Sequence, residues 1–114
     1  MKKGKLFSTA LGLALVLAEP FAHAAYNANM SGTVTSVVTY TEADYILFRL
    51  DNQPSSHPTC NPNYCIIAAV VSADRRKAIL SRLLLAKASG EVINIGHDNA
   101  SECSSGYIQV SRVG

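Results

Sequence analysis

The chain has 114 residues, of which 48% are hydrophobic and 16% charged, with three Cys and a formal net charge of +2. This length allows one small domain and excludes large catalytic architectures such as a doubly wound sheet. The low charged fraction and the ordinary apolar content also exclude a disordered chain and a coiled coil.

The first two dozen residues have the three parts of a secretory signal. Three Lys lie within the first five residues, an apolar stretch follows, and Ala22-His23-Ala24 supplies the small residues that signal peptidase reads. The apolar stretch, about 13 residues long, is shorter than the roughly 20 residues of a membrane-spanning helix. We therefore expect a cleaved signal peptide at residues 1–24, a secreted or periplasmic domain at residues 25–114, and no stable membrane insertion.

The predicted mature domain carries no net charge, because its basic and acidic residues balance at seven each. A nucleic-acid binder needs a net basic face to displace counterions from phosphates. We therefore expect no nucleic-acid partner.

The three cysteines all lie in the exported part, where oxidising conditions favour a disulfide. Cys60 and Cys103 lie in polar, turn-rich segments, whereas Cys65 opens an apolar run. We expect a Cys60–Cys103 bridge with Cys65 buried, and Cys60–Cys65 is the alternative pairing. A zinc site that adds His57 and His97 is disfavoured because the spacings fit no standard motif, so we expect neither a metal nor another cofactor.

Hydrophobic periodicity predicts strands at residues 32–41, 45–50, 65–71, 91–95 and 107–113, with a loop at residues 51–63. In the first strand the alternation places Val34, Val38 and Tyr40 on one face. One helix is expected at Arg75–Ala88, capped by Ser72 or Asp74 and ended by Gly90. The order β-β-β-α-β-β is that of the OB-fold, a five-stranded Greek-key barrel. In that barrel the loops that hold Cys60 and Cys103 lie at the same end.

The segments Tyr64–Val71, Asp74–Ala88 and Val92–Ile95, in this order after a signal peptide, resemble the B subunits of AB5 toxins. The subtilase cytotoxin and pertussis-like B subunits are the most similar in element order. The resemblance implies rings of five subunits that bind cell-surface glycans through surface pockets. It transfers no glycan-binding residue by position.

The predicted helix has a wider apolar surface than one core contact requires. One interpretation is that it plugs the end of the barrel, and the other is that its surplus apolar edge packs against neighbouring subunits. The candidate interface residues are Ile79, Leu80, Leu83 and Leu84.

Aromatic residues on or beside the strands are candidates for contact with a sugar, because a ring stacks on the sugar face and a phenol hydrogen-bonds its hydroxyls. They are Tyr40, Tyr45, Phe48, Tyr64 and Tyr107. No nucleophile motif or phosphate-binding loop occurs. A hydrolase built on His97, Asp98 and Ser101 is disfavoured because adjacent residues of an extended chain point to opposite faces.

The sequence therefore predicts a non-catalytic, exported binding module that resembles a toxin B subunit, recognises a glycan and forms homo-oligomers. The alternative is a stand-alone periplasmic protein that binds a protein partner or has a structural role. A ring of five in native mass measurement favours the first hypothesis, and a strict monomer favours the second.

Overall fold

A computed structural model describes residues 26–98 and 103–114 of the chain. The predicted signal peptide at residues 1–24 and the candidate Ser101 lie outside these residues. The elements are β1 (Ala28–Tyr40), β2 (Ala43–Leu50), β3 (Asn61–Ile67), α2 (Ala73–Ser89), β4 (Val92–His97), β5 (Cys103–Ser104) and β6 (Tyr107–Val113). Five strands are long, and β5 has only two residues.

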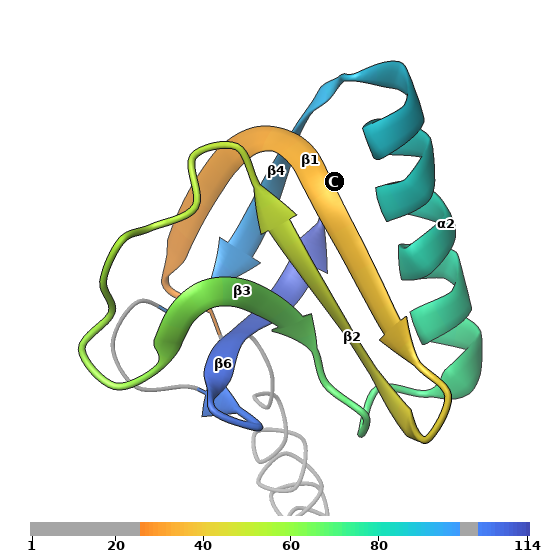
Figure 1. Ribbon diagram of the computed structural model, residues 1–114, viewed down its shortest axis with the longest axis horizontal. Coiled ribbons are helices and arrows are strands. Elements are labelled where there is room, and N and C mark those ends of the chain that lie inside the picture. The colour runs from red at the N-terminus through yellow and green to blue at the C-terminus, as the bar shows by residue number, and fades with distance from the viewer. Residues whose placement is uncertain (1–25, 99–102) are drawn as a thin grey trace, which may run out of the picture.

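The long strands close into a barrel with one helix between the third and fourth strands, as predicted (Figure 1). The strand order is β3-β2-β1-β4-β6, and a parallel pairing of β3 with β6 completes the closure. The strand β1 belongs to both walls of the barrel, since its first half pairs with β4 and its second half with β2.

The barrel interior is filled by apolar side chains that alternate along the strands. Phe48, Ile95 and Leu83 are at most 1% exposed, and they join strands and helix in one core. The buried residues of the main core cluster are Val34, Ile46, Phe48, Leu50, Cys65, Ile67, Leu83, Ala86, Ile93, Ile95 and Val110. Leu47, Cys60, Ile66, Ala68 and Ile108 are buried as well. Phe48 is therefore a core residue and is removed from the list of candidate sugar contacts.

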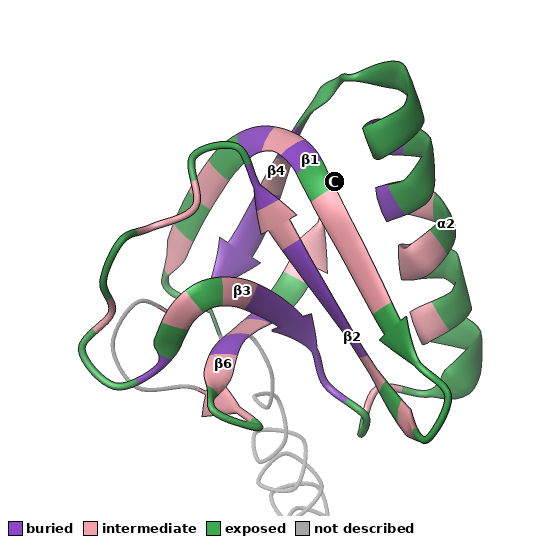
Figure 2. Cartoon of the chain, in the orientation of Figure 1, coloured by how far each residue is buried: buried purple, intermediate pink, exposed green. Residues whose placement is uncertain are grey.

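The helix α2 has Ser72, one of the two predicted caps, at its start and the predicted Gly90 at its end, and it is two residues longer at the start and one longer at the end than predicted. The Ser72 hydroxyl accepts a hydrogen bond from the Arg75 amide. Gly90, with φ 72°, closes the last turn because its amide donates a hydrogen bond to Ala86 O. The helix lies beside β1, and the side that faces away from the barrel is exposed (Figure 2).

The predicted faces of β1 are wrong beyond Thr35. The pairing with β2 moves from Val34–Leu50 to Ser36–Arg49, so Thr35 is the extra residue of a β-bulge. The bulge inverts the alternation, so Val37 packs against the core while Val38 and Tyr40 face outward. The first half of β1 also extends to Ala28, four residues before the predicted start, because it pairs with β4.

The predicted third strand is shifted along the chain. The strand β3 ends at Ile67, and the apolar residues that follow form a turn in which the Val71 amide donates to Ala68 O. Val70 is 87% exposed in this turn. The chain must turn here because the helix cap follows at Ser72.

The short strand β5 was not predicted. It forms a hairpin with β6 through Ser105 and Gly106, whose φ values are 49° and 86°. Positive φ at both central residues is typical of a type I′ turn. The Ser-Gly pair was the signal that could have revealed it.

Candidate functional site

The four candidate tyrosines face away from the barrel core and form two separate pairs. Tyr40 and Tyr45 meet edge to face with ring centroids 5.4 Å apart, and Tyr64 and Tyr107 do so at 6.1 Å. Both pairs alternate with core residues along their strands, which places them on the outside of the wall.

The two tyrosine pairs lie on either side of an apolar row. In this row Val38 pairs with Leu47, and Leu47 pairs with Ile66. Tyr45 lies two residues from Leu47 in one direction along β2, and Arg49 lies two residues away in the other. The separation of four residues between them corresponds to about 13 Å along the strand. One monosaccharide therefore cannot contact both pairs.

The second pair includes a cation. The guanidinium carbon of Arg49 lies 5.6 Å from the centre of the Tyr64 ring, and its Nη1 donates to the carbonyl of Asn63. Arg49, Tyr64 and Tyr107 are each half-buried, so the side chains are held in place but accessible. We call these three residues the Arg49 group. It combines ring edges, phenol hydroxyls and a fixed positive charge on one surface.

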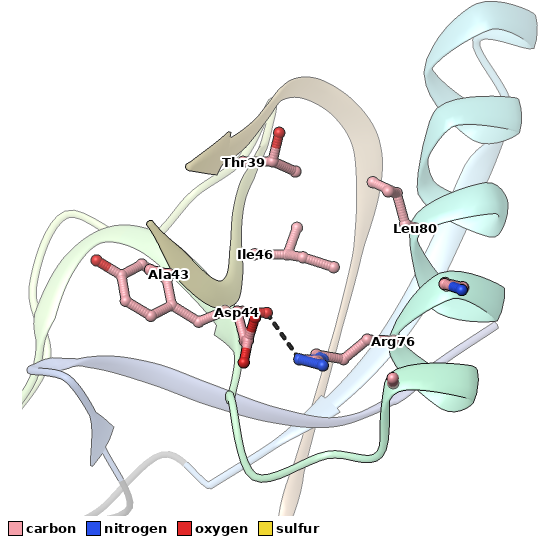
Figure 3. A pocket seen from close by; sticks show the side chains of 9 residues that line it. Thr39, Ala43, Asp44, Ile46, Arg76 and Leu80 are labelled. Atoms are coloured by element: carbon pink, nitrogen blue, oxygen red, sulfur yellow. Dashed lines mark hydrogen bonds between the residues drawn. The ribbon is translucent and has the colours of Figure 1, made fainter. Parts of the chain in front are cut away.

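A shallow pocket lies between the tip of the β1–β2 hairpin and the first turns of α2 (Figure 3). Ile46 extends from β2 toward the helix and Leu80 extends from the helix toward the sheet, while Arg76 donates a hydrogen bond of 3.0 Å to Asp44 O. The volume is about 200 Å³, less than the roughly 300–1,000 Å³ of typical ligand pockets. It has room for one small group. The residues that line it are Thr39, Ala43, Asp44, Tyr45, Ile46, Ala73, Arg76, Lys77 and Leu80.

The helix residues that were candidates for a subunit interface belong mostly to the core. Leu83 is 0% exposed, and Ile79 and Leu80 pack partly against the core cluster. The placement of Leu83 at an interface is therefore wrong, because no surface of this side chain is left for a partner. Leu84 is 48% exposed, and its neighbour Leu85, which the sequence analysis did not select, is 60% exposed.

The cysteines pair as predicted. Cys60 and Cys103 form the disulfide, with their Cα atoms 5.7 Å apart, and Cys65 is a buried free thiol. Burial raises the pKa of Cys65 to about 11, against an opposing effect of the hydrogen bond with Gln53. Cys65 therefore stays a neutral thiol and a poor nucleophile at neutral pH.

His57 holds the loop that leads into the disulfide. Its Nδ1 accepts hydrogen bonds from the amides of Thr59, at 3.2 Å, and of Cys60, at 3.0 Å. Its Nε2 lies 3.3 Å from Asp98 O, which fits a neutral ring that donates from Nε2. The ring therefore joins the loop before Cys60 to the end of β4.

His97 is buried at the end of β4, and its Nδ1 has no hydrogen-bond partner among the described residues. Burial lowers the pKa of His97, while Asp98 opposes the shift. The ring is thus a neutral wall residue and not a base presented to solvent. Within residues 26–98 and 103–114, no group of three or more metal-ligating side chains gathers.

Acidification is expected to destabilise the protein through His97. The unfolded chain takes up a proton near the ordinary histidine pKa of about 6.5, whereas the folded chain resists it. The free energy of unfolding should therefore fall as the pH drops below that value, by at most about 1.4 kcal/mol per pH unit from this one group. Urea unfolding of the wild type and of His97→Leu at about pH 7 and about pH 5 measures the effect.

The His97→Leu variant should lose part of the pH dependence, because it cannot take up the proton. An identical loss of stability on acidification in both proteins would show that another group is responsible.

No protein-family model, curated protein or solved structure matches this chain. In the part of the chain that the structure describes, no helix has the length and apolar character required to cross a bilayer.

Proposed function

We propose that the domain is an exported, non-catalytic binding module that resembles a toxin B subunit and recognises a glycan through the Arg49 group. The observation that carries the proposal is the contact of Tyr64 with both Tyr107 and Arg49 on an outward face. Aromatic rings with polar tips and a fixed hydrogen-bond donor are suited to an amphipathic sugar. The disulfide supports export, since disulfides persist in oxidising compartments.

The side chains of the Arg49 group are only partly buried, so a sugar residue of a glycan chain can reach them. The Tyr40–Tyr45 pair lies too far away to touch the same sugar residue and serves as a matched comparison. Weak binding at a single site is ordinary for shallow pockets, and several copies in one assembly raise the overall affinity.

Removal of the Tyr64 ring is expected to weaken glycan binding about tenfold, the equivalent of about 1.4 kcal/mol. A glycan array with the oxidised wild type identifies the ligand, and calorimetry then compares Tyr64→Ala, Tyr64→Phe and Tyr40→Ala. Tyr64→Phe should keep most of the affinity because it keeps the stacking ring. Tyr40→Ala should bind like the wild type.

The proposal fails if the folded, oxidised protein binds no glycan. Equal losses in Tyr64→Ala and Tyr40→Ala would also contradict it, because the Arg49 group would then have no special role.

A second candidate is a module that binds a protein, and the exposed Leu84 and Leu85 on α2 favour it. Adjacent exposed leucines contribute apolar surface of the kind that a protein partner can cover. A second copy of this chain is one such partner, as the homo-oligomer expected from the toxin resemblance requires. Native mass spectrometry distinguishes a ring from a monomer.

A further inference from the structure

The pocket between the tip of the β1–β2 hairpin and the first turns of α2 takes no part in the proposed function. Part of its lining is apolar, since Ile46 and Leu80 approach each other across it and Ala43 and Ala73 border it (Figure 3). Its volume of about 200 Å³ exceeds that of an apolar cavity of about 150 Å³ that holds a benzene molecule. The pocket therefore has room for an apolar chain or ring of about six carbons.

The helix α2 places two cations beside this apolar lining. Ala73, Arg76 and Leu80 share one face of the helix, and Lys77 borders that face. Arg76 is half-buried and Lys77 is exposed. Asp44 is the one acid among the nine residues that line the pocket, so the lining carries a net positive charge.

A hydrogen bond to the hairpin holds Arg76 by one nitrogen. Its Nη1 donates to the main-chain oxygen of Asp44 at 3.0 Å (Figure 3). Its Nε and Nη2 make no hydrogen bond to the described residues. These two nitrogens carry the parallel N–H bonds of one edge of the guanidinium, and such an edge matches the two oxygens of a carboxylate. The contact with the hairpin thus leaves a bidentate edge of Arg76 available to a ligand.

The charges of Arg76 and Lys77 are not neutralised by an ion pair within residues 26–98 and 103–114. The ion pair found there joins Arg82 to Glu91 at 2.9 Å, further along α2. Exposed cations alone do not make a binding site, because most are simply hydrated. Here, however, the two cations border an apolar pocket, and this combination suits a ligand with an apolar part and a negative charge.

We propose that this pocket binds a small free carboxylic acid whose carboxylate is attached to a short apolar chain or ring. The apolar part lies between Ile46 and Leu80, the carboxylate binds Nε and Nη2 of Arg76, and Lys77 adds electrostatic attraction. Tyr45, which also lines the pocket, lies about 13 Å along β2 from Arg49. The site therefore does not depend on glycan recognition by the Arg49 group.

The test is an NMR titration of the ¹⁵N-labelled protein at about pH 7, where a carboxylic acid is ionised. Hexanoate has the charge and the chain, hexanamide has the same chain without the charge, and acetate has the charge without the chain. Hexanoate should cause saturable shifts of the Ile46, Arg76 and Leu80 amides. Hexanamide and acetate should each bind at least tenfold more weakly, because each lacks one of the two interactions.

Substitutions in the lining separate charge from space. Arg76→Gln should weaken hexanoate binding at least tenfold and leave hexanamide binding unchanged. Ala73→Leu fills the pocket and should abolish the binding of both. Asp44→Asn removes the one acid and keeps the main-chain oxygen that holds Arg76, so it should tighten hexanoate binding several-fold. Arg75→Gln removes the same charge from an exposed residue outside the lining and should leave hexanoate binding unchanged.

The absence of saturable shifts at the pocket with hexanoate would overturn the proposal. Equal binding of hexanoate and hexanamide would do the same, as would equal weakening by Arg76→Gln and Arg75→Gln in variants whose amide dispersion shows that they are folded. Tyr64→Ala should leave hexanoate binding intact while it weakens glycan binding, so failure of one site is distinguishable from failure of the other.

Discussion

Breaking the disulfide should cause one of the largest losses of stability available in this chain. The bridge joins cysteines 43 positions apart, and a loop of that size corresponds to about 4 kcal/mol of denatured-state entropy, within the observed range of about 2–5 kcal/mol. A domain of this size has a small core, so such a loss is a large part of its total stability.

The variant Cys60→Ser/Cys103→Ser measures this loss by urea unfolding in the absence of reductant. The double replacement avoids leaving one unpaired thiol. Cys65→Ala is the matched control for loss of a cysteine outside the bridge. Reductant should lower the wild type to the level of the double variant and should have no effect on the variant itself.

An unchanged unfolding midpoint in the double variant would show that the bridge does not stabilise the protein in solution. The link between the loop before β3 and the short strand β5 would then have no effect on stability.

Truncation of Leu83 should be as damaging as loss of the disulfide, whereas truncation of its neighbour should not. Leu83 is fully buried among core residues of the barrel, and Leu84 is 48% exposed on the other side of the helix. Leu83→Ala should cost about 2–5 kcal/mol, since it leaves a cavity in the core. Leu84→Ala should change the stability of the monomer by less than about 0.5 kcal/mol, as Ala is a strong helix former.

The same pair of variants tests the role of the exposed helix face. If Leu84 lies between subunits, Leu84→Ala should reduce the assembled fraction in native mass spectrometry and leave the unfolding of the monomer unchanged. Equal destabilisation by the two substitutions would contradict the difference in burial between Leu83 and Leu84. A monomeric wild type would remove the homo-oligomer from the proposal and favour a different protein partner.

The element order could be predicted because its signals are local. Ser72 and Gly90 mark the ends of α2 through their own backbone and side-chain chemistry, within one turn of the helix. The alternation of Ile46, Phe48 and Leu50 reports a buried face over a single strand. The cysteine pairing was also accessible, since the polar surroundings of Cys60 and Cys103 contrast with the apolar run after Cys65.

The errors occur where two distant segments determine the geometry. The bulge at Thr35 exists because β1 pairs with β2 on one side of it and with β4 on the other. The end of β3 depends on its pairing with both β2 and β6. A period read from one segment contains no information about those partners.

The amino-acid sequence by itself determined the class of fold, the position of the helix and the disulfide. Each of these follows from propensities, caps or composition over a few neighbouring residues. Only the tertiary structure decided that Leu83 is a core residue, that the tyrosines form two pairs, and that Arg112 meets Tyr26 and Asn94. Closure of the barrel brings Arg112 to Asn94 across 18 positions of the chain and to Tyr26 across 86 positions, and local periodicity contains no information about such distant neighbours.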